Sequence, residues 1–284
     1  MDGATKGSTT LTFRPRGVRS GDLHVDVGTA GSASLVVQTV LPPLLTADGP
    51  STLVVEGGTH NPFAPPFDFL QRVLFPLLER LGPGLRSRLE RHGFAPAGGG
   101  RVVVEIEPVE RFDTLVLLER GRLRRMRATA LLANLPLHVA ERELRVVGKK
   151  LGWPEKHRKV EIATKAKGPG NALLLEAESE HLTEMVTAFG ERGVRAETVA
   201  QRACTEMRRY LAGDVPVGEH LADQLLLPLA LGAGGVYRTL PLTPHATTQV
   251  ELIGRFLDAG IEVEEVGSSV VEVRVRGRER AGPP

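Results

Sequence analysis

The segment LVVQTVLPPLLTADG, residues 35–49, decides the fold because a second copy of it occurs far along the chain. It aligns without gaps with LADQLLLPLALGAGG, residues 221–235. Seven of the fifteen positions are identical, where chance would give about one. The identities include Gln38 with Gln224. Both segments are apolar nearly all round and share a proline, which predicts two bent helices, each buried on several sides. We therefore expect one structural unit to occur twice.

The residues around both segments extend this repeat. Each copy is followed by a short extended run, a loop, a second helix and a valine-rich strand. In the first unit these elements are expected at residues 51–56, 57–66, 67–81 and 101–107. In the second unit they are expected at residues 236–240, 241–247, 248–259 and 270–275. In this register Thr59 lies over His245. The pattern predicts an α/β (α+β) protein built from repeated units.

The first residues of the chain resemble part of a further unit. Thr9–Arg14 and Leu23–Val27 are predicted to form a strand pair joined through Pro15, Gly17 and Gly21. They would be the closing strands of an earlier unit whose helices are absent, so that the first repeat is incomplete. An open sheet face of this kind predicts poor solubility or dependence on a partner.

Between the two units lies an insert of mixed character. It is expected to contain a helix at 137–151, an apolar strand at 172–176 and a long helix at 196–211 that Gly213 and Asp214 end. We therefore predict a repeat-built core at 1–119 and 216–284, and an inserted small α/β domain at 120–215. The last residues, 277–284, are predicted to be a disordered tail.

Composition excludes several classes of protein. No apolar run approaches the roughly 18 residues of a membrane-spanning helix, and the first residues lack the pattern of a secretory signal. Cys204 is the only cysteine, which excludes an intrachain disulfide and a four-cysteine zinc site. The expectation is a soluble cytoplasmic protein with no membrane partner.

Positive charge gathers in one part of the chain. Residues 111–167 hold 15 Lys or Arg against 6 Asp or Glu, a local balance of +9, although the whole chain carries only +2. Such a segment attracts phosphates, as an RNA contact would require, or it is a solvated surface. Trp153 is the only aromatic residue between Phe112 and Phe189, so base stacking by this segment is not expected.

His245 is the most suggestive single residue. The common phosphate-loop, dinucleotide, zinc-protease and nucleophile-elbow motifs are all missing from the sequence. His245 stands just ahead of a helix whose start we assign from Thr248 and Glu251, which have the spacing of a capping box. A helix N-terminus favours phosphate and disfavours imidazolium, and neutral imidazole is the nucleophilic form. A structural or merely exposed histidine is the alternative.

Two polar residues interrupt the second apolar helix at its start. In HLADQ, residues 220–224, Asp223 offers a carboxylate for Mg²⁺ and Gln224 an amide that reads a base edge. Helix capping with an internal hydrogen bond is the alternative. Gln38, at the matching place in the first unit, has the same two interpretations.

Three segments together resemble one family, the RNA 3′-terminal phosphate cyclases. They are GGTHNPFAPPFD (residues 57–68), HGFAPAGGG (92–100), and HLADQ (220–224) with Pro244-His245. The similarity runs from about Leu11 to Leu257 and includes KGPGN (167–171) and RGV (192–194) of the insert. It implies repeated units, each a four-stranded sheet under two helices, and an inserted small domain.

The resemblance also implies a chemistry and its residues. The family uses ATP and Mg²⁺ or Mn²⁺ to close an RNA 3′-phosphate end into a 2′,3′-cyclic phosphate through a covalent histidine–AMP intermediate. By this resemblance His245 is the nucleophile and Asp223 lies near the metal. Residues that would contact the nucleotide are Gln38, His220, Leu221, Ala222, Asp223 and Gln224, with Pro65 and Phe69 lining the adenine pocket. A homodimer is compatible with the resemblance.

The sequence departs from the family at its start. Family members begin with a strand, a Glu-Gly-Gly-Gly-Gln-type loop and arginine-bearing segments, none of which appears here. These parts would complete a repeat, add a metal-binding carboxylate and bind the terminal phosphate. An inactive shortened cyclase is therefore one alternative, and a non-catalytic RNA-binding or ribosome-assembly relative is another. His245 argues against the latter. An enolpyruvyl transferase has similar units, but the motifs do not indicate one.

Overall fold

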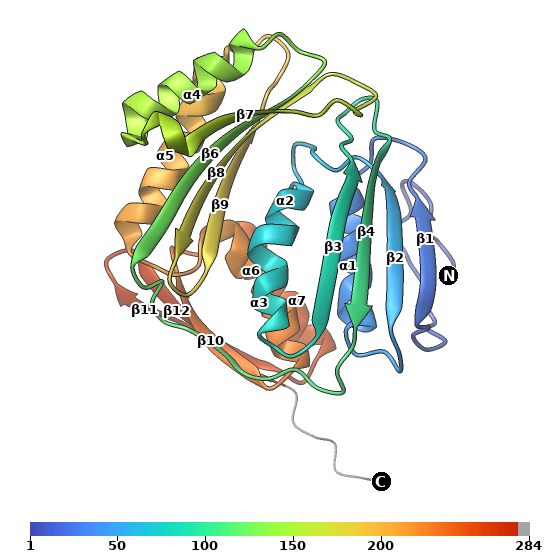
Figure 1. Cartoon of the computed structure of the whole chain (residues 1–284). Coiled ribbons are helices and arrows are strands. Elements are labelled where there is room, and N and C mark those ends of the chain that lie inside the picture. Colours follow the sequence, from blue (N-terminus) through green and yellow to red (C-terminus); the bar gives the residue numbers. More distant parts are fainter. Residues whose placement is uncertain (278–284) are drawn as a thin grey trace.

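The computed structural model describes residues 1–277, which form three four-stranded sheets and the helices packed on them (Figure 1). This arrangement confirms the predicted α/β class. The predicted tail lies outside the described residues, apart from Gly277. Within residues 1–277, no helix combines the length and the apolar character needed to cross a membrane.

The first unit is built on a sheet with the strand order β1-β2-β4-β3. Its strands are β1 (Gly21–Asp26), β2 (Ser51–Gly57), β3 (Gly84–Arg91) and β4 (Gly100–Glu107). Strand β1 runs parallel to β2, and the other neighbours are antiparallel. Buried residues alternate with half-buried ones along β2, because successive side chains of a strand point to opposite faces. One face of this sheet therefore packs on the core.

The helices of the first unit cover that face. They are α1 (Ala33–Leu44), α2 (Phe67–Phe69), the π-helical turn η1 (Leu70–Leu74) and α3 (Phe75–Glu79). Helix α1 begins after Ser32, whose side chain accepts a hydrogen bond of 3.2 Å from the backbone N–H of Leu35. The last three elements follow one another without a break, so they correspond to the single helix expected at 67–81.

The second unit repeats this architecture. Its elements are β5 (Leu115–Leu117), α6 (Glu219–Leu231), β10 (Gly234–Thr239), α7 (Pro244–Phe256), β11 (Gly260–Gly267) and β12 (Val270–Arg276). The strand order is β11-β12-β10-β5, with β5 parallel to β10 and the other pairs antiparallel. Strand β5 thus takes the place that β1 has in the first unit. Both units read strand, helix, strand, helix, strand, strand.

Two expectations about the strands at the start of the chain are wrong. Leu23–Val27 falls largely on β1, which pairs with β2 of the same unit, so it is not the closing strand of an earlier one. Thr9–Arg14 forms no strand and makes only an isolated bridge from Thr12 to Asp2. Without a neighbouring strand, these residues have no ladder in which to pair their backbone groups.

Helix α7 begins earlier than the sequence pattern predicted. Its N-cap is Thr243, whose hydroxyl accepts a hydrogen bond of 3.2 Å from Ala246 N–H. Pro244 takes the first helical position, where the missing N–H costs nothing. The hydroxyl of Thr248 instead donates to the carbonyl of Pro244, 2.8 Å away, so Thr248 is no cap. His245 consequently lies inside the first turn.

The third sheet comes from the residues between the two units. Its order is β7-β6-β8-β9, formed by β6 (Leu123–Ala133), β7 (Arg158–Ile162), β8 (Gly170–Ser179) and β9 (Thr183–Phe189). One face packs against α4 (His138–Leu151) and α5 (Ala196–Gly213), with a short 3₁₀ turn, η2 (Glu155–His157), before β7. The helices expected at 137–151 and 196–211 are confirmed, and Asp214 ends α5 in the left-handed conformation. The domain boundaries at 120 and 215 stay a prediction.

The opposite face of the third sheet joins the main core. Leu174 of β8 and Met185 of β9 belong to the same apolar cluster as the helices of both units. The guanidinium of Arg120 donates to the carbonyls of Tyr210 and Leu211, at 3.2 and 2.9 Å, and so ties the beginning of the insert to its end. The insert is therefore packed on the units, next to the start of α6.

Candidate active site

The N-terminal parts of α6 and α7 bring Asp223 and His245 together. Nδ1 of His245 lies 2.5 Å from Oδ2 of Asp223, and the imidazole is 79% exposed, whereas the carboxylate is 15% exposed. Because the carboxylate holds Nδ1, the neutral ring carries its lone pair on Nε2, facing solvent. The pair therefore presents an oriented nitrogen nucleophile at a helix N-terminus.

Asp223 has a second oxygen that is not used by the histidine. Oδ1 is buried and has no hydrogen-bond partner among the described residues. Burial raises the pKa of Asp223, and the nearby His245 and His220 act against this rise. A buried carboxylate oxygen without a partner is costly, and a hard divalent cation is a ligand that it fits.

His220, Asp223 and Gln224 lie on one side of the first turns of α6, as their spacing of three and four residues requires. The amide of Gln224 donates to the carbonyl of His220 over 3.0 Å. Oε1 of Gln224 accepts a hydrogen bond of 2.6 Å from Nε2 of Gln38 on α1. Gln38 and Gln224, the two positions that the repeat aligned, are thus in direct contact. They join the two units next to Asp223, the partner of His245.

The other predicted site residues lie deeper. Leu221 and Ala222 are fully buried in the core, so the structure leaves neither residue open to a nucleotide. Phe69 is also buried, at 3% exposure, and Pro65 is half-buried at the end of the loop that precedes α2. The η1 turn beside Phe69 contacts α6. Pro65 is therefore the more accessible of the two residues expected to line an adenine pocket.

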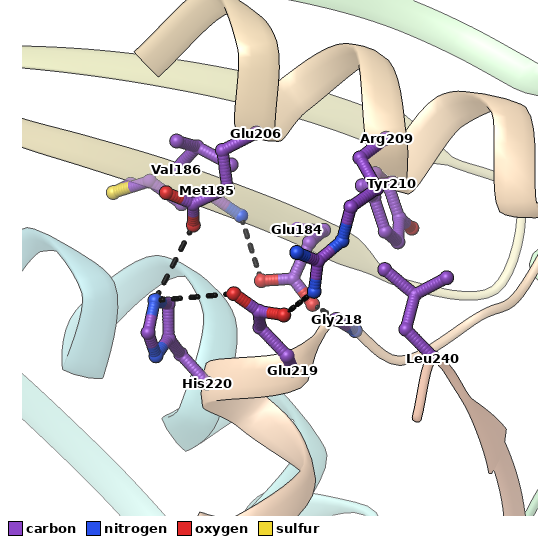
Figure 2. A pocket seen from close by; sticks show the side chains of 10 residues that line it. All are labelled: Glu184, Met185, Val186, Glu206, Arg209, Tyr210, Gly218, Glu219, His220 and Leu240. Carbon is purple, nitrogen blue, oxygen red and sulfur yellow. Dashed lines mark hydrogen bonds and ion pairs between the residues drawn. The ribbon is translucent and has the colours of Figure 1, made fainter. Parts of the chain in front are cut away.

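Sequence reasoning missed the polar residues that surround His220 (Figure 2). Glu206 on α5 lies 3.3 Å from Nε2 of His220, and its hydrogen bond raises the pKa of that histidine. Glu219 pairs with Arg209. Glu184, on β9, is buried behind them. A single acidic residue in an apolar strand was the available signal for Glu184, but nothing in the sequence pairs it with α6.

A second missed network lies in the GGTHNPFAPPFD segment. His60 is fully buried; its Nδ1 is 2.8 Å from Thr59 Oγ1, and its Nε2 is 2.8 Å from Asp68 Oδ2. Arg72 binds Asp68 at 2.7 Å and Glu176 of β8 at 2.9 Å. Burial acts to raise the pKa of Asp68, but the hydrogen bond and charge of His60 and the charge of Arg72 outweigh it and lower the pKa to about 2. The network fixes the loop before α2 and ties it to the insert.

The basic stretch at 111–167 is partly neutralised in the fold. Arg142 makes two hydrogen bonds to Glu197, at 2.8 and 2.6 Å, and Arg124 pairs with Glu180. Arg158 donates to the carbonyl of Leu144. These arginines join elements of the insert to one another, as a structural role requires.

Comparison with known proteins decides the family. The family model described as RNA 3'-terminal phosphate cyclase matches residues 1–263. The chain belongs to this family. Curated proteins named RNA 3'-terminal phosphate cyclase are similar over nearly the whole chain. The one from Koribacter versatilis is 48% identical over 99% of this chain and 79% of its own length. The one from Ectopseudomonas mendocina is 46% identical over 97% of this chain and 80% of its own.

Membership of the cyclase family confirms the resemblance drawn from the sequence, and with it the expectation of an enzyme. A third cyclase, from Pseudomonas fluorescens, is 47% identical over 96% of this chain and 79% of its own length. The matches include the insert as well as both repeats, so the whole described architecture is shared with these cyclases. The roles of individual residues stay predictions.

Proposed function

We propose that this chain uses ATP to convert an RNA 3′-terminal phosphate into a 2′,3′-cyclic phosphodiester, with His245 as the residue that carries AMP. The observation that carries the proposal is the contact of 2.5 Å between Nδ1 of His245 and Asp223. It leaves Nε2 exposed at the start of α7, where backbone N–H groups favour phosphate. A ligase of this kind acts in the cytoplasm on RNA ends.

Three displacements at phosphorus balance the reaction. Nε2 of His245 attacks the α-phosphorus of ATP, so that a P–N bond forms and the P–O bond to diphosphate breaks. An oxygen of the RNA 3′-phosphate then attacks the same phosphorus, releasing His245 and forming an RNA–adenylate. The neighbouring 2′-hydroxyl finally attacks the 3′-phosphorus, loses its proton and expels AMP. Each covalent intermediate divides a difficult displacement into easier ones.

Asp223 orients the nucleophile throughout. It accepts a hydrogen bond from Nδ1–H, which keeps Nε2 unprotonated for attack, and it stabilises the positive charge that the ring gains when it is phosphorylated. The amides of Gln38 and Gln224, which touch across the two units, are placed to bind the nucleotide beside it. Pro65 would pack on the adenine.

The unpartnered Oδ1 of Asp223 fits a divalent cation, Mg²⁺ or Mn²⁺. Such an ion would offset the negative charge of the triphosphate. The other ligands would be phosphate oxygens and water, since magnesium is commonly held by one or two carboxylates and its substrate.

The test is incubation with α-labelled ATP and Mg²⁺ or Mn²⁺, with wild type beside His245→Ala and His24→Ala. His24 is a matched control because it is also exposed and lies 3.3 Å from a carboxylate, that of Glu56, on β2 of the first unit. We expect acid-labile, alkali-stable covalent label in wild type and His24→Ala, and none in His245→Ala. Conversion of an RNA 3′-phosphate to a phosphatase-resistant end should follow the same pattern.

Two results would contradict the proposal. Equal label in His245→Ala would exclude this histidine as the AMP carrier. Absence of label from wild type and both variants would mean that the chain alone does not adenylylate itself.

A further inference from the structure

The insert contacts the start of α6, which holds the residues predicted to bind the nucleotide, through one buried carboxylate. Glu184 lies on β9 and is 3% exposed. Its Oε2 accepts a hydrogen bond of 2.6 Å from the backbone N–H of Gly218, and its Oε1 accepts one of 3.0 Å from Met185 N–H. Gly218 is the N-cap of α6. Figure 2 shows the carboxylate of Glu184 next to Glu219, which belongs to the first turn of α6.

This contact replaces a cap that α6 lacks in its own sequence. Gly218 has no side chain to satisfy the free N–H groups at the helix start, and no side-chain cap is present. A Cβ at this position would lie 2.6 Å from Oε2 of Glu184, so only glycine admits the carboxylate. A negative charge here also matches the positive end of the helix. The beginning of α6 is therefore fixed by a residue of the insert.

The groups that face Glu184 set its ionisation. They are Glu206, Arg209 and Tyr210 on α5, and Glu219 and His220 on α6. Burial raises the pKa of Glu184 to about 7; the hydrogen bonds from Met185 and Gly218 and the charge of His220 act against this rise, whereas Glu206 adds to it. Both protonation states are therefore populated near neutral pH.

A cation site at the same place is the competing interpretation. Glu206, Glu219 and His220 each offer a ligand atom, and these atoms lie within 4.8 Å of one another. Arg209, however, already pairs with Glu219, so the charge of one of the three candidate ligands is already neutralised. The cluster is therefore assigned to ion pairs that hold His220, not to a metal.

We propose that Glu184 is a positioning residue of the nucleotide site: from the insert sheet it fixes the first turn of α6, and thereby the places of His220, Asp223 and Gln224. This inference rests on the proposed function and extends it, because it makes the insert a necessary part of the ATP site. Only the ionised carboxylate of Glu184 accepts hydrogen bonds from the backbone N–H groups of both Met185 and Gly218. A protonated acid or an amide at this position turns one of the two acceptors into a donor.

The experiment compares Glu184→Gln with Glu143→Gln. Glu143 is a matched control: it is fully buried in the insert, its pKa is raised to about 7 by burial, and it bonds Asn171 on β8, with no link to α6. We expect the KM for ATP in self-adenylylation to rise about tenfold in Glu184→Gln, because a hydrogen bond to a charged acceptor is lost. The kcat should change much less, and Glu143→Gln should match wild type in both constants.

The pH profile provides a second readout. In wild type the KM for ATP should fall as pH rises through about 7, where Glu184 loses its proton. Glu184→Gln should lose most of this dependence, and Glu143→Gln should keep it. The dependence expected from His220 has the opposite sign, because the loss of its positive charge as the pH rises weakens the attraction for ATP.

Hydrogen exchange without nucleotide separates this inference from the proposed function. The amides of 218–222 should exchange faster in Glu184→Gln than in wild type or Glu143→Gln. If wild type forms no label yet this difference is found, the proposed function fails and the positioning role stands. The inference is overturned if Glu184→Gln exchanges and binds ATP as wild type does, or if both variants are impaired alike.

Discussion

The two repeated units each place a histidine beside a carboxylate after their second strand, but they use the pair in opposite ways. In the first unit His60 is fully buried, and both of its ring nitrogens have partners, Thr59 and Asp68. In the second unit His245 is 79% exposed, and Asp223 alone is paired with it among the described residues. A ring whose two nitrogens are occupied can only hold structure together, whereas a ring held at one nitrogen can react with the other.

The source of the carboxylate explains the difference. Asp68 belongs to the helix that follows its histidine, so the ring is drawn under that helix. Asp223 belongs to α6, the helix before His245, so the ring is drawn to the junction of two helix starts. One architecture thus gives a closed loop in one copy and an open site in the other.

The contrast between the two units is tested most strongly by removing the charge of Asp223 from the second pair. Asp223→Asn should lower the rate of self-adenylylation by about 10²-fold, because the amide no longer holds the Nδ1–H tautomer. Its free energy of unfolding should stay close to wild type, since burial already disfavours the carboxylate there. Single-turnover labelling and urea unfolding measure the two quantities. A wild-type labelling rate would contradict the orienting role.

The equivalent change in the first pair should do the reverse. Asp68→Asn leaves Arg72 and His60 without their buried partner, which should lower the free energy of unfolding by about 3 kcal/mol. Label per folded molecule should be little changed when measured at saturating ATP. If Asp68→Asn unfolds like wild type but fails to label, the first pair also serves chemistry, and the contrast between the units is wrong.

Acid provides a separate test of the first pair. The pKa of Asp68 is about 2 in the folded chain, against an ordinary value of 3.8. Its stabilisation is therefore fully present above about pH 4 and is lost as the pH falls towards 2. Urea unfolding at several pH values should show this loss in wild type, and a flatter profile in Asp68→Asn.

The smallest expected effect concerns the contact that joins the units. A double-mutant cycle with Gln38→Leu and Gln224→Leu should give a coupling energy of about 1 kcal/mol, as for a neutral side-chain hydrogen bond. Urea unfolding of the four proteins measures it. A coupling near zero would mean that the two glutamines serve the nucleotide and not the junction.

The repeat made much of this fold predictable. Helices α1 and α6 and strands β2, β4, β10 and β12 follow from aligned apolar patterns, and the alignment of Gln38 with Gln224 marked two residues that touch. Apart from β1, the edge strands of the two units were not foreseen. Strand β3, GLRSRLER, alternates charged and apolar residues, and its exposed face gives no apolar run. Strand β5 has three residues, too few for any period.

The site was predictable only where local sequence decides it. Pro244 after Thr243 was the true signal for the start of α7, but the spacing of Thr248 and Glu251 imitated a capping box. The approach of Asp223 to His245 depends on how α6 and α7 pack. Glu184 meets α6 only after the insert has folded onto the units, so no window of sequence contains that contact.

Strand β5 has a consequence for the order in which the chain folds. Leu115 pairs with Gly235, and the entire insert is synthesised between the two. The first unit draws all four strands from 21–107 and can close as soon as they leave the ribosome. The sheet next to His245 must wait for a long loop to close, and such distant pairings form slowly. If the proposed function holds, the site that reacts with ATP therefore forms last, after the insert is in place.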